Sequence, residues 1–299
     1  MESIKFVDVM TDEGFKRVFG VEANMILLLR AAFKDRKIVK VKYLDKEMFG
    51  RFKGTRRSIY DLYCEDDEGR KFIVEVQYKE VDNFINRSIY YVSNGLQQQT
   101  RPGRAWKNDM KPVYFLALMP FNLPGTPERQ WLHRFELREE TSGQRLTENL
   151  RFVYIELGKF DKQADELCSD EDRMAYFMKH AATLQDRPTS FGAREYDTLF
   201  NAARFAGMDL KRQRKYMNWL QIYRDNKNAD ERAKRIAREE GLAEGFAGGF
   251  AGGREQGREE GKEEGREETK AEIAKGLVQN GVPMEIITKV TGLTAEDLD

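Results

Sequence analysis

The sequence predicts an α/β protein in which helices cover a small mixed sheet, followed by a mostly helical C-terminal region. Three observations support this class. Apolar residues recur at helical spacing over residues 12–33 and again over 82–99. A stretch rich in β-branched and aromatic residues at 57–78 is typical of a hairpin. A continuous apolar run at 112–119 is typical of a buried strand.

The first helix has a recognisable start. Thr11 is a suitable N-cap, and Asp12 and Glu13 follow it in the first turn. The apolar pattern continues past Gly20 to residue 33, and the period then changes. We expect the first strand of the sheet at residues 38–44.

Two pairs of strands are expected after it. The runs at 57–64 and 71–78 flank a turn that contains Gly69, which predicts a β-hairpin. Residues 131–139 and 150–157 predict a second pair, which we interpret as a hairpin added to the core.

The second half of the chain is predominantly helical in pattern. Apolar residues recur at helical spacing between 160 and 225, and a glycine stands at every fourth position from 241 to 265. Each glycine costs a helix roughly 1 kcal/mol relative to alanine, and Glu–Lys and Glu–Arg pairs offset part of that cost. The repeat therefore fits either a helix that guides close-packed chains or a solvated helix or tether. The expected segments are a core at 1–125, a hairpin extension at 126–160, a helical subdomain at 161–235, the glycine repeat at 236–270 and a short helical hairpin at 271–299.

Charge is segregated along the chain, although the chain is neutral overall with 51 Lys and Arg against 51 Asp and Glu. Residues 30–57 hold eleven basic and three acidic residues, and basic clusters recur at 101–111 and 211–215. Such regions are typical of a phosphate-binding surface. No apolar run approaches the ~20 residues that a membrane helix needs. Two cysteines and the lack of a secretory signal predict a cytoplasmic protein.

The hairpin at 57–78 places two acids opposite each other. With a turn at 66–70, Asp61 lies across from Glu75 with Cβ atoms about 5 Å apart, and Gln77 lies diagonal to Asp61 on the same face. The other face is apolar, so we expect it to form the core. Neighbouring carboxylates on a covered sheet repel unless a cation lies between them, which suits Mg²⁺. A salt-bridged or simply exposed pair is the alternative.

The residues around these acids match a known pattern. Asp61, followed after thirteen residues by Glu75, Val76 and Gln77, resembles the PD-(D/E)xK nuclease superfamily. The segments TDEGFKRVFG, RRSIYDLYCEDDEGRKFIVEVQ, NRSIYY and PVYFLALMPF resemble the recombination-promoting nuclease (Rpn) family of transposase-like proteins. The resemblance is specific over residues 8–125 and loose over the rest. It implies a restriction-endonuclease-like core of order α-β-β-β-α-β.

The resemblance also implies a metal site. Asp61 and Glu75 are the expected ligands of Mg²⁺, or of Mn²⁺ in its place, and the Val76 carbonyl completes the set. Gln77 occupies the position usually held by lysine. A neutral amide can orient water but carries no positive charge, so we expect a nearby cation such as Lys79 or Lys16 to take the place of the missing lysine.

Further residues follow from the same resemblance. Asp12 or Glu13 on the first helix is expected to hold the metal or its water from outside. The candidates for phosphate contact are Lys16, Lys79 and Arg87. We expect His133 and His180 to be structural, since they lie in unrelated segments.

These features predict a Mg²⁺-dependent DNA endonuclease with low sequence specificity, linked to recombination or transposition. The alternative is a catalytically weak or inactive nuclease-fold protein that acts as a DNA-binding or assembly module. DNA is the expected partner in both cases, and the C-terminal helical repeat is a candidate for homo-oligomer formation. No membrane partner is expected.

Overall fold

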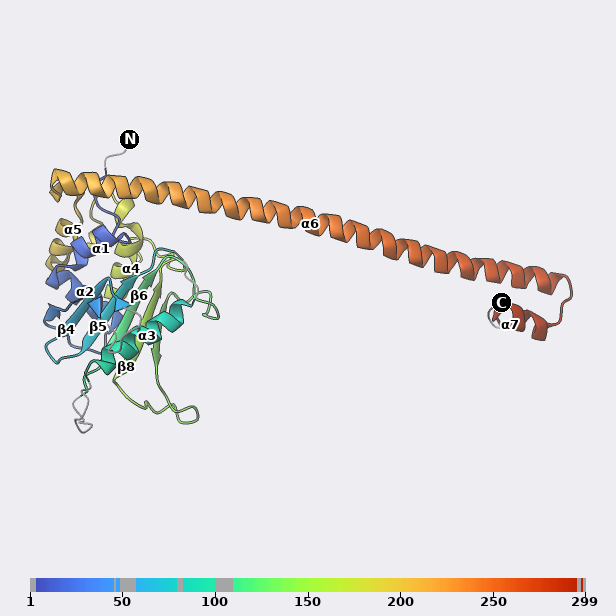
Figure 1. Cartoon of the computed structure of the whole chain (residues 1–299), viewed down its shortest axis with the longest axis horizontal. Coiled ribbons are helices and arrows are strands. Elements are labelled where there is room, and N and C mark those ends of the chain that lie inside the picture. Colours follow the sequence, from blue (N-terminus) through green and yellow to red (C-terminus); the bar gives the residue numbers. More distant parts are fainter. Residues whose placement is uncertain are drawn as a thin grey trace. The chain divides into compact units, whose positions relative to one another are not determined.

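The computed structural model describes residues 4–45, 47–48, 58–79, 83–99, 110–294 and 297. The chain forms two compact units, Met1–Met217 and Asn218–Asp299 (Figure 1). The basic residues expected at 49–57 and 101–109 lie outside the described residues.

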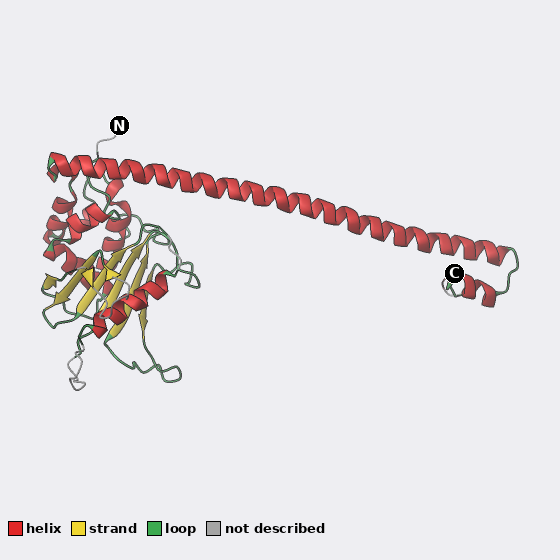
Figure 2. Cartoon of the chain, viewed as in Figure 1, coloured by secondary structure: helices red, strands yellow, loops and turns green. Residues whose placement is uncertain are grey.

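The first unit contains a six-stranded mixed sheet (Figure 2). In the order in which they lie in the sheet, its strands are β1 (Val41–Tyr43), β4 (Leu62–Asp66), β5 (Lys71–Val76), β6 (Val113–Met119), β8 (Leu150–Glu156) and β7 (Leu132–Glu136). Antiparallel pairs join β1 to β4, β4 to β5 and β7 to β8, whereas β5, β6 and β8 run parallel. A separate small ladder pairs β2 (Glu47–Met48) with β3 (Ser58–Ile59).

Helices cover both faces of this sheet, which confirms the predicted α/β class. Helix α3 (Phe84–Gln97) crosses one face and packs on β5 and β6 (Figure 1). On the other face the Phe33 ring, at the end of α2 (Glu22–Ala32), lies 5.4 Å from Phe72 and 5.3 Å from Tyr114. Helices α1 (Asp12–Phe19), α4 (Asp170–His180) and α5 (Asp197–Ala203) pack on α2. Short 3-10 turns follow α4 and α5, at Ala181–Thr183, Thr189–Phe191, Arg194–Tyr196 and Phe205–Gly207.

The helical stretch predicted at 12–33 is two helices rather than one. Helix α1 ends at Phe19, because the Gly20 N–H bonds back to the carbonyls of Lys16 and Val18 and the chain then turns. The predicted N-cap at Thr11 is confirmed, since its hydroxyl accepts the Gly14 N–H at 2.9 Å. A Cβ on Gly14 would meet the Asp8 carbonyl oxygen at 2.1 Å, so the loop before α1 lies directly against the helix.

The predicted hairpin has the expected register. Leu62 pairs with Val74 and Glu65 pairs with Lys71. The turn is held by Asp66, whose carboxylate accepts the Arg70 N–H at 2.9 Å and its Nε–H at 2.6 Å. The run predicted at 57–64 is interrupted, however, by a bend at Asp61 that separates β3 from β4.

The second predicted hairpin does not stand apart from the core. Strands β7 and β8 pair antiparallel as expected, but β8 also pairs with β6 in parallel from Val113–Leu150 to Met119–Glu156. The sheet therefore continues through residues 126–160, and the compact unit runs to Met217 instead of ending at 125. Strand β6 is buried along its whole length, so it needs a neighbouring strand at each edge.

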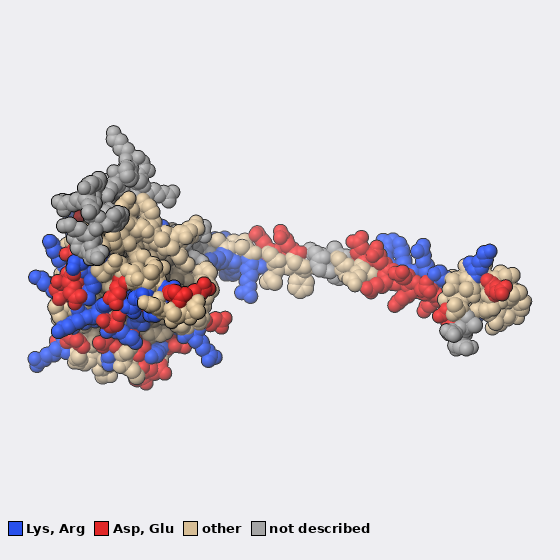
Figure 3. Space-filling model, turned by 90° about the horizontal axis from the view of Figure 1, so that it is seen from below, with Lys and Arg blue, Asp and Glu red and all other residues tan. Residues whose placement is uncertain are grey.

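Most of the C-terminal part is helical. Helix α6 spans Leu210–Gln279 and includes the glycine repeat, so the structure favours the helix over the flexible tether. Clusters of Lys and Arg side chains and of Asp and Glu side chains lie along α6, with uncharged stretches between them (Figure 3). The predicted break at 280–283 is confirmed, with Gly281 at φ 74°, and α7 (Met284–Thr291) follows it. Among the described residues, no helix combines the length and apolar character needed to cross a membrane.

Candidate active site

Asp61 and Glu75 meet where the β4–β5 hairpin opens. Extending the register beyond Leu62–Val74 by one position pairs these two acids. The Asp61 carboxylate accepts the Val76 N–H at 2.8 Å, and the Asp61 N–H donates to the Glu75 carboxylate at 3.3 Å. The structure therefore brings together the three residues from which we expected a metal site.

The surroundings of this pair disfavour two negative charges. Glu75 is 3 % exposed. Burial, followed by the charge of Asp61, raises the pKa of Glu75 to about 8. Burial also raises the pKa of Asp61, with a further contribution from Asp12. A simply exposed pair, one of the alternatives from the sequence, does not describe these residues.

Both faces of the sheet are buried in the core. We expected only the face opposite the acids to be buried. Tyr63 and Ile73 are fully buried with Phe84 and Val92 of α3. Tyr60 joins the same cluster, with its ring 5.5 Å from that of Tyr63. Strict alternation would separate Tyr60 from Tyr63, so the bend at Asp61 changes which face the chain presents. The acids consequently lie at the open end of a covered strand pair.

Helix α1 brings one of its two leading acids to this site. Asp12 forms an ion pair with Lys16, and both charges act on Asp61, where Asp12 raises the pKa and Lys16 lowers it. Glu13 instead contacts Lys215 at 3.0 Å. The structure thus distinguishes between the two acids that the sequence left open, because the charge of Asp12 acts on Asp61 and Glu13 pairs with α6.

Helix α3 contributes a cation on the other side. Arg87 Nη2 lies 3.7 Å from Glu75 Oε2, and the guanidinium lies 5.8 Å from the Phe84 ring centre and 5.5 Å from that of Tyr91. Arg87 Nε is buried and has no hydrogen-bond partner among the described residues. The salt-bridged alternative is therefore present in part, as a long contact made by arginine.

Gln77 and Lys79 follow β5. The Gln77 amide donates to Glu75 Oε2 at 3.1 Å, so it orients the carboxylate. Lys79 is exposed two residues further on.

Tyr91 is a neighbour that the sequence did not single out. It stands four residues after Arg87 on α3, and burial followed by the charge of Glu75 raises its pKa. Its ring contacts that of Tyr60 at 5.0 Å. The i,i+4 spacing of Arg87 and Tyr91 is the signal that could have identified it.

The two histidines lie in packed surroundings, as we expected of structural residues. His133 is buried, with Nε2 3.1 Å from Glu156 Oε1, and the His180 ring lies 4.6 Å from that of Tyr176.

The donor set suits a hard divalent cation with few protein ligands. Among the described residues, no three His, Cys, Asp or Glu side chains form a metal-binding group. Two carboxylates are present, and the Val76 carbonyl points to the same strand edge as the Val76 N–H that bonds Asp61. Magnesium commonly takes one or two carboxylates and completes its shell with water and phosphate. The residues present fit that ion.

A mixed sheet flanked by helices, with two acids where a β-hairpin opens beside a parallel strand, defines a PD-(D/E)XK-type nuclease fold. Residues 9–233 match the model of the PD-(D/E)XK nuclease family transposases, and the chain belongs to this family. Membership associates the protein with nuclease and transposase function. Comparison with curated proteins gave no match, and comparison with solved structures gave none.

Proposed function

We propose that the protein is a Mg²⁺-dependent DNA endonuclease that hydrolyses phosphodiester bonds with little sequence preference. The protein would act in recombination or transposition in the cytoplasm. Mn²⁺ would be able to take the place of Mg²⁺ at the site. The observation that carries the proposal is the contact between Asp61 and the buried Glu75, with both pKa values raised. A bound divalent cation would keep both groups ionised.

The residues of the site would have separate roles in catalysis. Asp61, Glu75 and the Val76 carbonyl would hold the cation, which when bound polarises the phosphodiester and makes water a stronger nucleophile. Gln77 holds the Glu75 carboxylate in one orientation through its amide. Asp12 would accept a hydrogen bond from the attacking water on the α1 side.

Arg87 is the cation best placed to act where lysine is missing. Its Nη2 already lies 3.7 Å from Glu75, and its buried Nε–H would find a partner in a phosphate oxygen. Charge-assisted bonds of this kind stabilise the negative charge that develops in the transition state. Lys16 and Lys79 would contact flanking phosphates.

A plasmid-nicking assay with Mg²⁺ tests the proposal. Asp61→Ala and Glu75→Ala should each lower cutting by at least about 100-fold, because each removes a ligand. Glu140→Ala is the matched control, since Glu140 is an exposed acid after β7. Circular dichroism should stay native in all three variants. Cutting that survives either site substitution contradicts the proposal.

A second function is favoured by the same neighbours of Glu75. The amide of Gln77 and the guanidinium of Arg87 partly compensate the carboxylate without any metal. The protein would then hold DNA, or assemble with copies of itself through the glycine repeat of α6, without cutting. This function predicts DNA retention without cleavage, and a melting temperature that Mg²⁺ and Mn²⁺ leave unchanged.

A further inference from the structure

Four basic residues lie close together in the first two turns of helix α6. Lys211, Arg212, Arg214 and Lys215 are all exposed and belong to the first compact unit. The next residue, Tyr216, is 1 % exposed and fixes this part of the helix. Its hydroxyl accepts the Asp8 N–H at 2.7 Å, and its ring lies 5.7 Å from Phe205.

These cations adjoin the helix that leads into the active site. Lys215 Nζ lies 3.0 Å from Glu13 of α1. Arg212 is close enough to Arg17 of α1 that, after burial, its charge lowers the pKa of Arg17. The residue before Glu13 is Asp12, which acts on Asp61. The basic opening of α6 therefore adjoins the same helix, α1, whose Asp12 acts on Asp61.

Nearby acids compensate only part of this charge. Glu13 pairs with Lys215, and Asp209 lies 3.5 Å from Arg212. Arg17 adds a further positive charge, and its Nε donates to the Ala202 carbonyl at 2.8 Å. The surface formed by α1 and the first turns of α6 is thus positive next to a candidate phosphodiesterase site.

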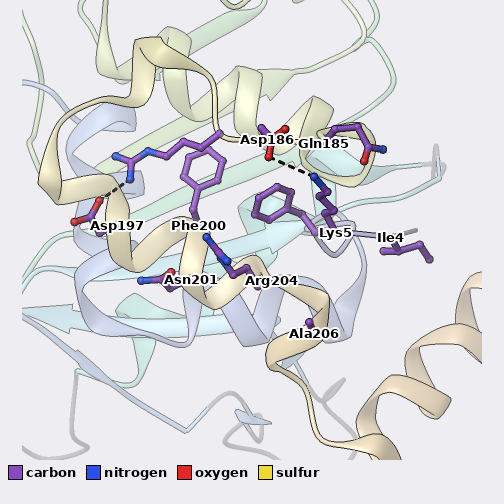
Figure 4. Close-up of a pocket in the computed structure, with 11 residues that line it drawn as sticks. Ile4, Lys5, Gln185, Asp186, Asp197, Phe200, Asn201, Arg204 and Ala206 are labelled. Carbon is purple, nitrogen blue, oxygen red and sulfur yellow. Dashed lines mark hydrogen bonds and ion pairs between the residues drawn. The ribbon is translucent and has the colours of Figure 1, made fainter. Parts of the chain in front are cut away.

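The cavity lined by residues of α5 and the N-terminal segment offers a weaker positive field. It has a volume of about 680 Å³ and includes Lys5, Arg187 and Arg204 (Figure 4). Lys5 is paired with Asp186 and Arg187 with Asp197. Two of its three cations are therefore neutralised within the protein.

We propose that Lys211, Arg212, Arg214 and Lys215 form a docking surface for the backbone of duplex DNA. This inference rests on the proposed function, because it takes the scissile phosphate to lie at Asp61 and Glu75. Duplex DNA carries one negative charge per roughly 1.7 Å of its axis, so a duplex seated at the site presents several phosphates to the α6 surface. The surface would hold the duplex in position and would take no part in the chemistry.

Binding measured without metal isolates this role from cleavage. The test variant of the full chain carries K211Q, R212Q, R214Q and K215Q. The matched control carries R232Q, K234Q, R235Q and R238Q, which remove the same charge from exposed positions later in α6. Affinity for a short labelled duplex is measured in EDTA across a series of KCl concentrations.

The test variant should bind at least about tenfold more weakly, and its slope of log K against log salt should be shallower by up to about 3.6, at about 0.9 per contact. The control substitutions should change the affinity by less than about twofold. They should change the slope by less than about 0.9, which corresponds to one phosphate contact. A charge-keeping variant with K211R, R212K, R214K and K215R should bind like the wild type. Its recovery separates lost charge from lost folding.

Equal losses in the test and control variants would overturn the inference, because net charge alone would explain them. Unchanged affinity and slope in the test variant would do the same. The inference would also be overturned if the test variant bound DNA as the wild type does but no longer bound vesicles that contain an anionic lipid. Failure of the nicking assay with this salt dependence intact would reject the proposed catalysis and leave the docking surface standing.

Discussion

At the scale of single residues, burying Glu75 beside Asp61 makes the metal-free protein sensitive to pH. In the folded state the pKa of Glu75 is raised to about 8, whereas the ordinary pKa of a glutamate is 4.5. Between these values the folded state binds more protons than the unfolded state, so stability falls as pH rises. The free energy of unfolding in EDTA should therefore decrease across this range.

The Glu75→Gln variant should lose most of that decrease, since its amide does not titrate. Urea denaturation at several pH values, followed by near-UV circular dichroism, measures both proteins. Parallel pH profiles for the wild type and the variant would contradict the raised pKa of Glu75.

The choice between Arg87 and Lys79 as the active-site cation is also a residue-scale question. Arg87→Gln should lower single-turnover cleavage by about 10²–10³-fold, because it removes a charged donor beside Glu75. Lys79→Gln removes the same charge at an exposed position after β5 and should cost less than about tenfold. A larger loss from Lys79→Gln would give that lysine the role assigned to Arg87.

The sequence could identify the acids but not all of their neighbours. Asp61 and Glu75 were predictable because a short turn around Gly69, at φ 81°, sets the hairpin register. Asp12 and Glu13 could not be separated, since consecutive helical residues differ by about 100° and the packing direction of α1 depends on distant elements. Tyr91 was missed although its i,i+4 spacing from Arg87 places both residues on one face of α3.

At the scale of elements, the sequence predicts those strands that a local pattern specifies, and it does not predict pairings between distant segments. The strands of the β4–β5 hairpin and the buried strand β6 follow from alternation, turn residues and apolar runs. The insertion of β8 beside β6 joins segments separated by the whole β7 connection, so no local signal specifies it. The bend at Asp61 separates β4 from β3, and β3 pairs with β2 in a ladder outside the six-stranded sheet.

The glycine repeat of α6 gives a prediction for one element. A Cβ on Gly257 or Gly261 would meet no atom of the described part of the chain within 4 Å. Replacing both by alanine should stabilise the helix by about 1 kcal/mol each. Far-UV circular dichroism during thermal unfolding should show higher helix content and later melting.

Gly14→Ala is the matched contrast, because its Cβ would meet the Asp8 carbonyl oxygen at 2.1 Å. That change should destabilise the first unit by about 1–3 kcal/mol. If the Gly257 and Gly261 substitutions instead lowered helix stability or dissociated an oligomer, the glycine face would be covered by another chain.

At the scale of the whole molecule, the two compact units should respond differently to a divalent cation. The acids lie in Met1–Met217, whereas Asn218–Asp299 contains most of α6 and all of α7. A cation that binds only the folded first unit stabilises it by RT ln(1 + [L]/Kd), about 2.7 kcal/mol at 100 times Kd. Calorimetry should therefore show one transition that rises with Mg²⁺ or Mn²⁺ and one that does not.

Asp61→Ala should abolish the metal-dependent rise, because it removes one of the two carboxylates that meet where the β4–β5 hairpin opens. The metal-free melting temperature of that variant should be equal to or above that of the wild type, since Asp61 raises the pKa of Glu75 through charge repulsion. The control is Glu140→Ala, which should keep the wild-type response. A cation effect that persists in Asp61→Ala, or that moves both transitions together, would mean that the cation binds elsewhere and that Asp61 and Glu75 are held by Arg87 and Gln77 alone.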